Sequence, residues 1–406
     1  MSVLILNRLP HEEAPYEEWL RASNEDLILL TSFETESQYD TTRYAYMEGF
    51  TDYYSNEDVE IRARELFEQF RYHTVIALSE LDLLRAAKLR SMLGIIGQQY
   101  ESALAFRNKI VMKNLASKAG VAVPPFTALE GQMDLLEFRS KYGLPLVVKP
   151  ICGSASEEVR VLENEEQLDS FYRRDLPQGM EVETFISGDM YHVDGLVLNN
   201  DLKFIWPSKY LNGCLAFKNQ AYSGSYNLSK DHILFRRLVN FTNHLLNALP
   251  RPETFAFHAE IFHTPTDDLV LCEIASRAGG ARLREIFKQN FNVDLNMYTV
   301  LGQCKIDRTL EITHGTLGGL VLIHPRRGRV RGIPLAPRYS WITEYKVYVD
   351  EGEIVSPAKL SIDRIASLVV QGNNESMVRD RLERSATWFM DSLVWEAEIK
   401  EKDSIR

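Results

Sequence analysis

The 406-residue sequence contains few cysteines, and they lie far apart. Its four cysteines (Cys152, Cys214, Cys272 and Cys304) form no CxxC pair, which argues against a zinc site or a disulfide framework. There is also no uninterrupted apolar run of about 18 residues, the length that a membrane-spanning helix needs. The first residues, MSVLILNRLP, have no positively charged segment before their short apolar run, unlike a secretory signal. These absences predict a reduced, cytoplasmic protein without a membrane partner.

An excess of basic residues is also missing. The chain has 46 basic and 57 acidic side chains, which gives a formal net charge of −11. Binding to a nucleic acid backbone requires clustered Lys and Arg, so this balance argues against nucleic acid as a partner. A small anion such as a nucleotide needs only a local basic site. With 45% hydrophobic and 25% charged residues, the chain has the composition of a folded protein rather than a disordered one.

Two common phosphate-binding motifs are absent. Neither GxxxxGK[ST] nor GxGxxG occurs in the sequence, so the phosphates of a nucleotide must be held by other groups. Lys109, at the start of a predicted helix, and Lys149, at the end of the apolar strand LPLVVKP, are candidates. A lysine that closes an apolar strand is more often simply solvated. Because proline and a loop of small residues follow Lys149, its position favours contact with an anion.

Strand-like and helix-like runs alternate over the first hundred residues, at 3–6, 27–30, 59–70, 74–78 and 80–93. Strands that alternate with helices indicate a parallel βαβ sheet. From Glu181 onward the pattern becomes antiparallel, with three consecutive strands expected near 181–186, 190–198 and 202–206. The segment Glu375–Ile399 is expected to be a final amphipathic helix. These runs predict a fold class that combines α/β and α+β.

The most informative segment is a predicted hairpin over 258–277. Turn-forming residues at Thr264–Asp268 separate two β-rich runs. If the turn is centred between residues 266 and 267, the numbers of cross-strand partners sum to 533, and Glu260 lies opposite Glu273, about 5 Å away at Cβ. Like charges in that position destabilise a hairpin unless a cation neutralises them, and oxygen-only ligands point to Mg²⁺ or Mn²⁺. A turn shifted by one residue would instead leave the two glutamates on opposite faces as solvated charges.

A glycine pair stands just beyond the hairpin and leads into a predicted helix. Gly279 and Gly280 let the backbone approach a ligand closely, and the N-terminus of the following helix offers free N–H groups to an anion. Arg277 and Arg282 flank the pair and are able to donate charge-assisted hydrogen bonds to phosphate or carboxylate. A glycine pair before a helix is weak evidence by itself. Its position directly after the two glutamates makes this segment the candidate catalytic centre.

Taken in order, these segments resemble the ATP-grasp carboxylate–amine ligases. The resemblance rests on FRNKIVMK…AGVAVPPF, YGLPLVVKP, GSASEEV, VETFISGDMYHVDG, FHAEIFHT and LCEIASRAGGARL, and it covers roughly residues 75–305. Length and layout are most similar to those of the bacterial L-amino acid ligases, which make dipeptides. The resemblance implies an N-terminal pre-ATP-grasp (Rossmann-like) domain at 1–105, a lid subdomain at 106–185 and a C-terminal antiparallel-sheet catalytic domain at 186–406, with an extension from about 306.

The resemblance also implies which residues hold ATP. Lys109 and Lys149 match the two lysines that grip the nucleotide phosphates. The flexible loop that covers the phosphates matches Gly153, Ser154, Ala155 and Ser156. The hinge between two strands that meets adenine, largely through its backbone, matches Glu183, Thr184 and Ile186.

The resemblance assigns the metal and catalytic residues as well. Glu260 and Glu273 match the acidic Mg²⁺ ligands, in agreement with the hairpin arithmetic. Arg277 matches the arginine that steadies the transferred phosphoryl group and the acyl phosphate, and we place Gly279, Gly280 and Arg282 with it. Asp194, next to His192 on the middle antiparallel strand, is a secondary binding candidate, on the expectation that it faces the cleft.

Three positions depart from the pattern of the family. Glu157 and Glu158 stand where a small residue and glycine are common, so closure of the loop is expected to differ. Met190 stands where many members have the acid that binds ribose. Ala275 replaces the asparagine of the common Glu-x-Asn-x-Arg element, which removes one metal ligand and leaves open whether one or two metal ions bind.

The activity implied by the resemblance is that of an ADP-forming ligase. A carboxylate is phosphorylated by ATP, and an amine then attacks the acyl phosphate to form an amide. The expected substrates are a small carboxylate and an amine, with amino acids as the first candidates and pockets drawn from 208–227 and 282–290, and the expected assembly is a homodimer. Two alternatives stay open: an ATP-grasp carboxylase or another biosynthetic ligase, and an ATP-binding protein without turnover.

Overall fold

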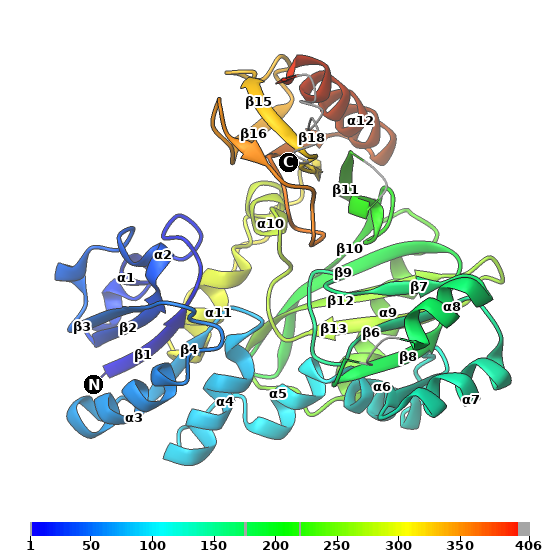
Figure 1. Ribbon diagram of the computed structural model, residues 1–406. Helices are drawn as coiled ribbons and strands as arrows, with labels where there is room; N and C mark the ends of the chain where they lie inside the picture. Colours follow the sequence, from blue (N-terminus) through cyan, green and yellow to red (C-terminus); the bar gives the residue numbers. More distant parts are fainter. Residues whose placement is uncertain (1, 174–176, 219–220, 397–406) are drawn as a thin grey trace, which may run out of the picture.

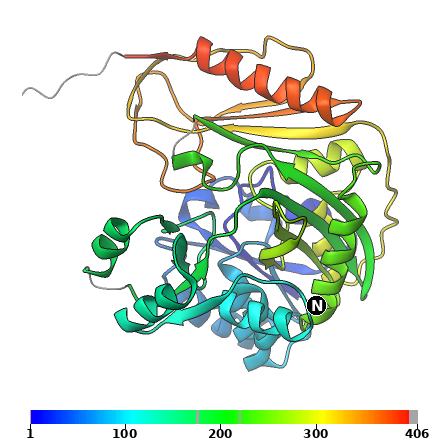
Figure 2. The same ribbon diagram turned by 90° about the vertical axis from the view of Figure 1, so that its right-hand side faces the viewer.

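The computed structural model describes residues 2–173, 177–218 and 221–396. Figure 1 shows a small N-terminal sheet on one side of the molecule, a large sheet in the middle and a second small sheet on the other side. In the turned view of Figure 2, this second small sheet and its helices project from the body of the molecule. Among the described residues, no helix combines the length and apolar character needed to cross a membrane. The expected boundaries of the three domains and the expected homodimer stay predictions.

The N-terminal sheet is parallel and has the strand order β3-β2-β1-β4. Its strands are β1 (Ser2–Asn7), β2 (Asp26–Ser32), β3 (Tyr46–Phe50) and β4 (Thr74–Ala77). The helices around it are α1 (Tyr16–Trp19), α2 (Phe33–Glu36), α3 (Asp58–Phe70) and α4 (Asp82–Leu93), with 3-10 turns η1 (Arg21–Ser23) and η2 (Thr41–Arg43). Every residue of β1 is buried, because Leu4 and Leu6 pack in one apolar cluster and Val3 and Ile5 in another. The predicted parallel βαβ sheet is confirmed.

The second small sheet is antiparallel and has the strand order β5-β8-β6-β7. Its strands are β5 (Phe126–Leu129), β6 (Leu146–Pro150), β7 (Arg160–Leu162) and β8 (Met180–Thr184). The helices before and within it are α5 (Tyr100–Arg107), α6 (Lys109–Lys118), α7 (Gln132–Tyr142) and α8 (Glu165–Tyr172). The strand expected near 181–186 is present as β8, but it lies in this sheet rather than in the large sheet with the next two expected strands. Met180 and Val182 bury their side chains in the core of this sheet, so β8 pairs with β5 and β6 instead.

The large sheet has eight strands in the order β13-β12-β9-β10-β11-β14-β18-β16, and all its pairings are antiparallel. Its strands are β9 (Asp189–Leu198), β10 (Asp201–Tyr210), β11 (Tyr222–Asn227), β12 (Phe255–His263), β13 (Leu269–Ala275), β14 (Leu317–Ile323), β16 (Ile342–Val347) and β18 (Ala366–Gly372). Its helices are η3 (Ala216–Lys218), α9 (Phe235–Ala248), α10 (Leu283–Phe291), α11 (Leu295–Gln303) and α12 (Glu375–Ser392). Side chains of α6, α9 and α12 contribute to one core of this sheet, and those of α10 and α11 to another.

The C-terminal segment differs from its prediction. The final helix, α12, ends at Ser392 rather than at residue 399, because Leu393 turns to extended backbone and Val394–Trp395 form strand β19. This strand joins β15 (Gly328–Gly332) and β17 (Ile354–Val355) in a three-stranded sheet. Residues 397–399 of the predicted helix lie outside the described residues.

Candidate active site

A cavity of about 540 Å³ lies between the small antiparallel sheet and the large sheet. Its apolar lining includes Val147, Val161, Phe185, Met190, Leu215 and Phe262. Its charged lining includes Lys109, Lys149, Glu183, Glu260 and Glu273. The connection from β8 to β9, residues 185–188, forms part of the wall. Such a mixture suits a nucleotide, because the base is largely apolar and the phosphates are anionic.

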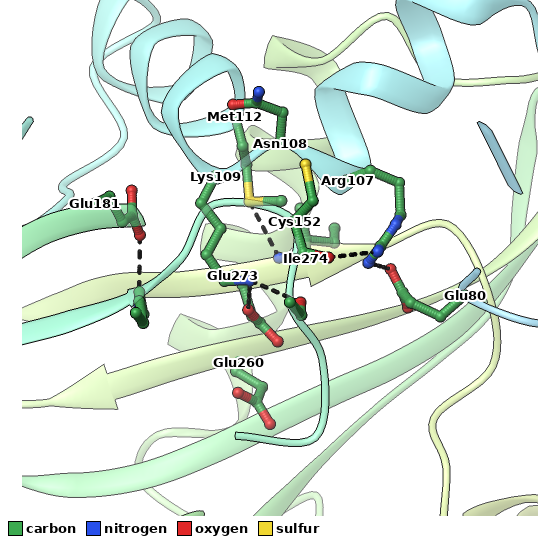
Figure 3. A network of polar contacts seen from close by, with 12 residues as sticks. Glu80, Arg107, Asn108, Lys109, Met112, Cys152, Glu181, Glu260, Glu273 and Ile274 are labelled. Carbon is green, nitrogen blue, oxygen red and sulfur yellow. Dashed lines mark hydrogen bonds and ion pairs between the residues drawn. The ribbon is translucent and has the colours of Figure 1, made fainter. Parts of the chain in front are cut away.

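Glu260 on β12 lies directly opposite Glu273 on β13, as the sequence predicts. The geometry behind this pairing differs from the prediction. Beside the turn, Ile261 pairs with Leu271, so the hairpin is centred on Thr266 rather than between residues 266 and 267. A β-bulge at Cys272 then shifts the register by one residue and brings the two glutamates opposite each other. Figure 3 shows the two carboxylates close together below Lys109.

Lys109 joins this carboxylate pair to the loop after β6. Its Nζ atom lies 3.0 Å from Oε2 of Glu273 and donates a hydrogen bond of 2.9 Å to the carbonyl oxygen of Gly153. The position of Lys109 is fixed by the start of α6, because the Asn108 side chain accepts hydrogen bonds from the backbone N–H groups of Ile110 and Val111. The lysine side chain is almost fully buried, so its charge acts at close range in this cavity.

Glu260 is held ionised by a chain of buried polar groups. The Tyr210 hydroxyl donates a hydrogen bond of 2.7 Å to Oε1 of Glu260, and Nε2 of His258 lies 3.6 Å from the same oxygen. Burial alone would raise the pKa of Glu260, but these partners, His258 first, lower it to about 2. Burial likewise disfavours the charged imidazole of His258, yet the Asp194 carboxylate, 2.8 Å away, raises the pKa of His258 to about 10.

Asp194 does not face the cleft, in contrast to the expectation. It is fully buried, and its two carboxylate oxygens contact Nδ1 of His192 at 2.6 Å and Nδ1 of His258 at 2.8 Å. The reason is that Asp194 lies in the middle of β9, paired with His258 on β12 and covered by Gly279. A Cβ atom at Gly279 would lie 2.7 Å from Asp194 and 2.8 Å from His258. This glycine therefore makes room for the protein's own Asp–His pair.

Lys149 belongs to a buried group of two lysines and two glutamates. Its Nζ atom lies 2.5 Å from Oε1 of Glu183, and Lys113 of α6, fully buried, contacts Glu183 and also Glu181 at 2.7 Å. Burial lowers the pKa of the Lys149 ammonium, but Glu183 and the other acidic groups nearby together outweigh burial and raise this pKa well above its ordinary value. Lys113 and Glu181 were not identified from the sequence. Two signals were available: Lys113 follows Lys109 by one helical turn, and Glu181 shares a strand face with Glu183.

The loop after β6 covers both the charged group and a second cavity. Three of its residues, Ala155, Ser156 and Glu158, have left-handed backbone conformations with φ of 53°, 57° and 51°. The Ser156 hydroxyl donates a hydrogen bond of 3.3 Å to the Cys214 carbonyl oxygen, and the Ser361 N–H donates one of 2.9 Å to the Ala155 carbonyl oxygen. The loop is thus fastened to the large sheet and to the C-terminal segment.

The second cavity has a volume of about 360 Å³ and shares part of its wall with the first. The residues that line both cavities are Ser154, Ser156, Tyr210, Gly213, Cys214, Glu260 and Glu273. Its other walls come from the N-terminal unit, from β11 and from the segment 277–285. The two cavities therefore meet at the carboxylate pair.

Arg277 lines the second cavity and is held by the N-terminal unit. Its Nε atom lies 2.5 Å from Oε2 of Glu80, which also accepts a hydrogen bond from Arg107. Burial raises the pKa of Glu80, but the charges of Arg277 and Arg107 outweigh burial and lower it. Glu80 was not identified from the sequence, because nothing in its local pattern indicates a partner almost 200 residues away.

Arg282 lines neither cavity, in contrast to its expected place at the catalytic centre. Its guanidinium is paired with Glu344 on β16. The helix α10 begins at the next residue, and it is Arg284 that lines the second cavity, bound to Asp294 at 2.7 Å and 3.0 Å. Gly280 does line the second cavity, but a Cβ atom there would meet nothing within 4 Å, so packing does not require a glycine.

We compared the sequence and the structure with those of known proteins. No family model matches the sequence. The chain is 25% identical over 334 residues to an L-arginine-specific L-amino acid ligase of Bacillus subtilis, an alignment that covers 78% of this chain and 79% of that protein. The crystal structure of an L-amino acid ligase from Bacillus licheniformis superposes with a TM-score of 0.78 at 15% identity and covers 98% of both chains. The chain therefore has the ATP-grasp fold and is similar in sequence to an L-amino acid ligase.

Another ATP-grasp structure is similar over almost the whole chain. It is the biotin carboxylase domain of the Hydrogenobacter thermophilus 2-oxoglutarate carboxylase, in complex with MgADP, ADP and bicarbonate. It has a TM-score of 0.69 at 14% identity and covers 97% of this chain and 90% of that one. At this level of identity the likeness shows the fold alone, so the predicted ATP-grasp fold is confirmed while the reaction is argued below from the site.

The ATP-grasp fold implies a magnesium ion, and the residues present fit one. Glu260 and Glu273 offer oxygen ligands from opposite strands, and the low pKa of Glu260 keeps it ionised near neutral pH. Ala275, paired with His258, adds no ligand atom. Of the predicted hinge residues, Glu183 and Ile186 line the first cavity, whereas Thr184 does not and uses its backbone N–H to bind the Pro125 carbonyl oxygen.

Proposed function

We propose that this ATP-grasp protein is an ATP- and Mg²⁺-dependent ligase that joins a carboxylate to an amine, with two amino acids as substrates and a dipeptide as product. The observation that carries the proposal is the meeting of two cavities at one carboxylate pair, Glu260 and Glu273. The first cavity has the lining that a nucleotide needs. An acid bound in the second cavity would lie beside Arg277 and next to the terminal phosphate of a nucleotide bound in the first.

The proposed reaction has two steps, and neither needs a protein nucleophile. A substrate carboxylate attacks the γ-phosphate of ATP to give ADP and an acyl phosphate, and an amine then attacks the acyl carbon, which releases phosphate. Lys109, Lys149 and Arg277 would bind and neutralise the phosphoryl oxygens. Glu260 and Glu273 would hold the Mg²⁺ ion, which supplies further neutralisation of phosphate charge.

Exclusion of water is the second requirement, because an acyl phosphate hydrolyses readily. The loop over residues 153–158 borders both cavities and is fastened by Ser361 and Cys214. In the proposed cycle this loop opens to admit ATP and closes over the phosphates. Ala155 and Ser156 hold the closed form with backbone and side-chain hydrogen bonds, in place of the glycines common at such loops.

The amino-acid character of the substrates is supported by two observations. The relative in Bacillus subtilis is named for L-arginine-specific ligation. In this chain, the segments expected to shape the substrate pocket, 208–227 and 282–290, contribute Tyr210, Ser223, Leu283 and Glu285 to the second cavity; residues 219–220 of the first segment lie outside the described residues.

The test is ADP release from Mg·ATP across a matrix of amino acid pairs, with mass spectrometry of the products. We expect ADP and a dipeptide to form together for at least one pair. The Glu273→Gln variant should lose this activity, while Glu253→Gln, an exposed glutamate just before β12, should retain it. ADP release that depends on bicarbonate rather than on an amine would favour the carboxylase alternative. Binding of ATP without ADP release under every condition would favour a non-catalytic protein.

A further inference from the structure

A serine and a histidine form a hydrogen-bonded pair in the wall of the second cavity, on the side opposite the N-terminal unit. Ser223 lies on β11, and His324 directly follows β14. Nε2 of His324 lies 2.9 Å from the Ser223 hydroxyl oxygen, and Nδ1 lies 2.8 Å from the carbonyl oxygen of Asp363. Ser223 lines the cavity, whereas His324 is buried behind it.

The direction of these two hydrogen bonds follows from the chemistry of the partners. A backbone carbonyl oxygen only accepts, so Nδ1 of His324 must carry a proton. Burial lowers the pKa of His324 and favours the neutral ring, in which Nε2 has no proton and accepts. The Ser223 hydroxyl therefore donates its hydrogen to His324. What Ser223 presents to the cavity is its oxygen lone pairs, which makes it a fixed acceptor.

Ser223 lies too far from the reacting centre to contact the atoms that change bonds. Ser225 pairs with Tyr210, whose hydroxyl binds Glu260. Ser223 is two residues farther along β11, a distance of about 7 Å. A substrate with its carboxylate or amine at the carboxylate pair would thus reach Ser223 with its side chain.

The charge of the same cavity indicates which kind of side chain fits. Glu13 and Glu285 both line it, as do Arg8 and Arg284, and Arg284 lies 3.9 Å from Glu285; among the described residues, no ion pair involves Glu13. Burial and, after it, the charge of Glu285 raise the pKa of Glu13, against the smaller opposing effect of nearby arginines. A cation in the cavity would neutralise this repulsion.

We propose that Ser223, oriented by His324, is a specificity-determining residue that accepts a hydrogen bond from a cationic amino-acid side chain, such as a guanidinium or ammonium group, bound in the second cavity. This inference rests on the proposed function for its substrate class. It goes beyond that function because it names the group of the protein that distinguishes a donor-bearing side chain from an aliphatic one.

The experiment measures binding, so that it does not depend on turnover. Calorimetry with the full chain, saturated with Mg²⁺ and a non-hydrolysable ATP analogue, compares arginine, citrulline and norleucine. Arginine and citrulline both carry N–H donors, only arginine is charged, and norleucine has neither feature. We expect arginine to bind most tightly and norleucine least. The Ser223→Ala variant should weaken arginine and citrulline about tenfold or more and leave norleucine unchanged, and Ser223→Thr should restore binding.

Two outcomes would overturn the inference. One is equal weakening of all three ligands in Ser223→Ala, which would indicate a structural role. The other is unchanged arginine binding in that variant. The His324→Phe variant gives a second measurement, because without its acceptor Ser223 is free to donate, and the preference for arginine over norleucine should fall. Failure of the ligase proposal would be visible separately, as arginine binding that depends on Ser223 without any dipeptide or ADP formed.

Discussion

Lys109 Nζ lies 3.0 Å from Glu273 Oε2, so a lysine assigned to phosphate and a carboxylate assigned to metal neutralise each other at the junction of the two cavities. Nucleotide binding would exchange this ion pair for two others, lysine with phosphate and glutamate with Mg²⁺. Removal of Glu273 would leave the almost fully buried charge of Lys109 without this carboxylate, whereas removal of Lys109 would leave the partly exposed Glu273 unpaired.

The first prediction concerns Lys109→Met. Loss of a charge-assisted hydrogen bond to phosphate, with Glu273 left unpaired, should weaken Mg·ATP binding by about ten- to hundredfold. Calorimetric titration with a non-hydrolysable ATP analogue measures the effect. Lys118→Met is the matched control, because Lys118 is an exposed lysine of the same helix. Equal affinity of the Lys109 variant and the control would refute the assignment.

The second prediction concerns the fully buried Lys113. Replacement by methionine leaves Glu181 and Glu183 without one of their cations, and the free energy of unfolding should fall by about 3 kcal/mol or more. The double variant Lys113→Met/Glu181→Gln should recover part of this loss, because the surplus negative charge is then removed. Guanidinium unfolding of the wild type, both single variants and the double variant completes the cycle. Additive losses would show that the lysine and Glu181 do not interact.

The hairpin of β12 and β13 shows which features the sequence predicts and which it does not. Alternation and turn chemistry place Glu260 opposite Glu273, and the structure has them so. The turn is nevertheless centred half a residue away, and without the bulge at Cys272 the glutamates would lie on opposite faces. A bulge depends on pairing and packing between strands, so the local sequence pattern does not predict it. The predicted pairing of Glu260 with Glu273 is therefore correct, although the prediction used the wrong turn centre and did not include the bulge.

The misassigned residues share another cause. Arg282 follows the glycine pair in sequence, yet the turn into α10 directs it to Glu344, while Glu80, distant in sequence, holds Arg277. Local spacing predicts which residues share an element and a face. It does not predict partners that tertiary packing brings together from other elements. Asp194 is the same case, since its burial depends on the segment that covers β9.

The third prediction concerns the loop over the phosphates. Ala155 and Glu158 adopt left-handed backbone conformations that cost a residue with a side chain about 1 kcal/mol. Ala155→Gly and Glu158→Gly should therefore favour the closed loop and lower the dissociation constant of an ATP analogue about two- to fivefold. Glu157→Gly is the control, because Glu157 has no positive φ and glycine there only adds flexibility. The prediction fails if all three variants behave alike.

The last prediction concerns the pH dependence of stability through His258. Its pKa is about 10 in the folded protein, against an ordinary value of 6.5, because Asp194 favours the charged ring. A raised pKa means that the folded state binds the proton more tightly than the unfolded state does. The stabilisation is thus complete below about pH 6.5 and is lost as the pH rises through about 10.

The His258→Gln variant removes the pH-dependent stabilisation that the protonated imidazole provides. Between pH 7 and pH 10 the wild type should lose a few kcal/mol more of its unfolding free energy than the variant does. Urea unfolding at a series of pH values measures the difference. His244→Gln is the control, because His244 is exposed on α9 and contacts the Ala119 carbonyl oxygen. Parallel curves for the wild type and His258→Gln over this range would mean that the Asp194–His258 pair does not hold a proton. In that case the low pKa of Glu260 would need another source than the imidazolium beside it.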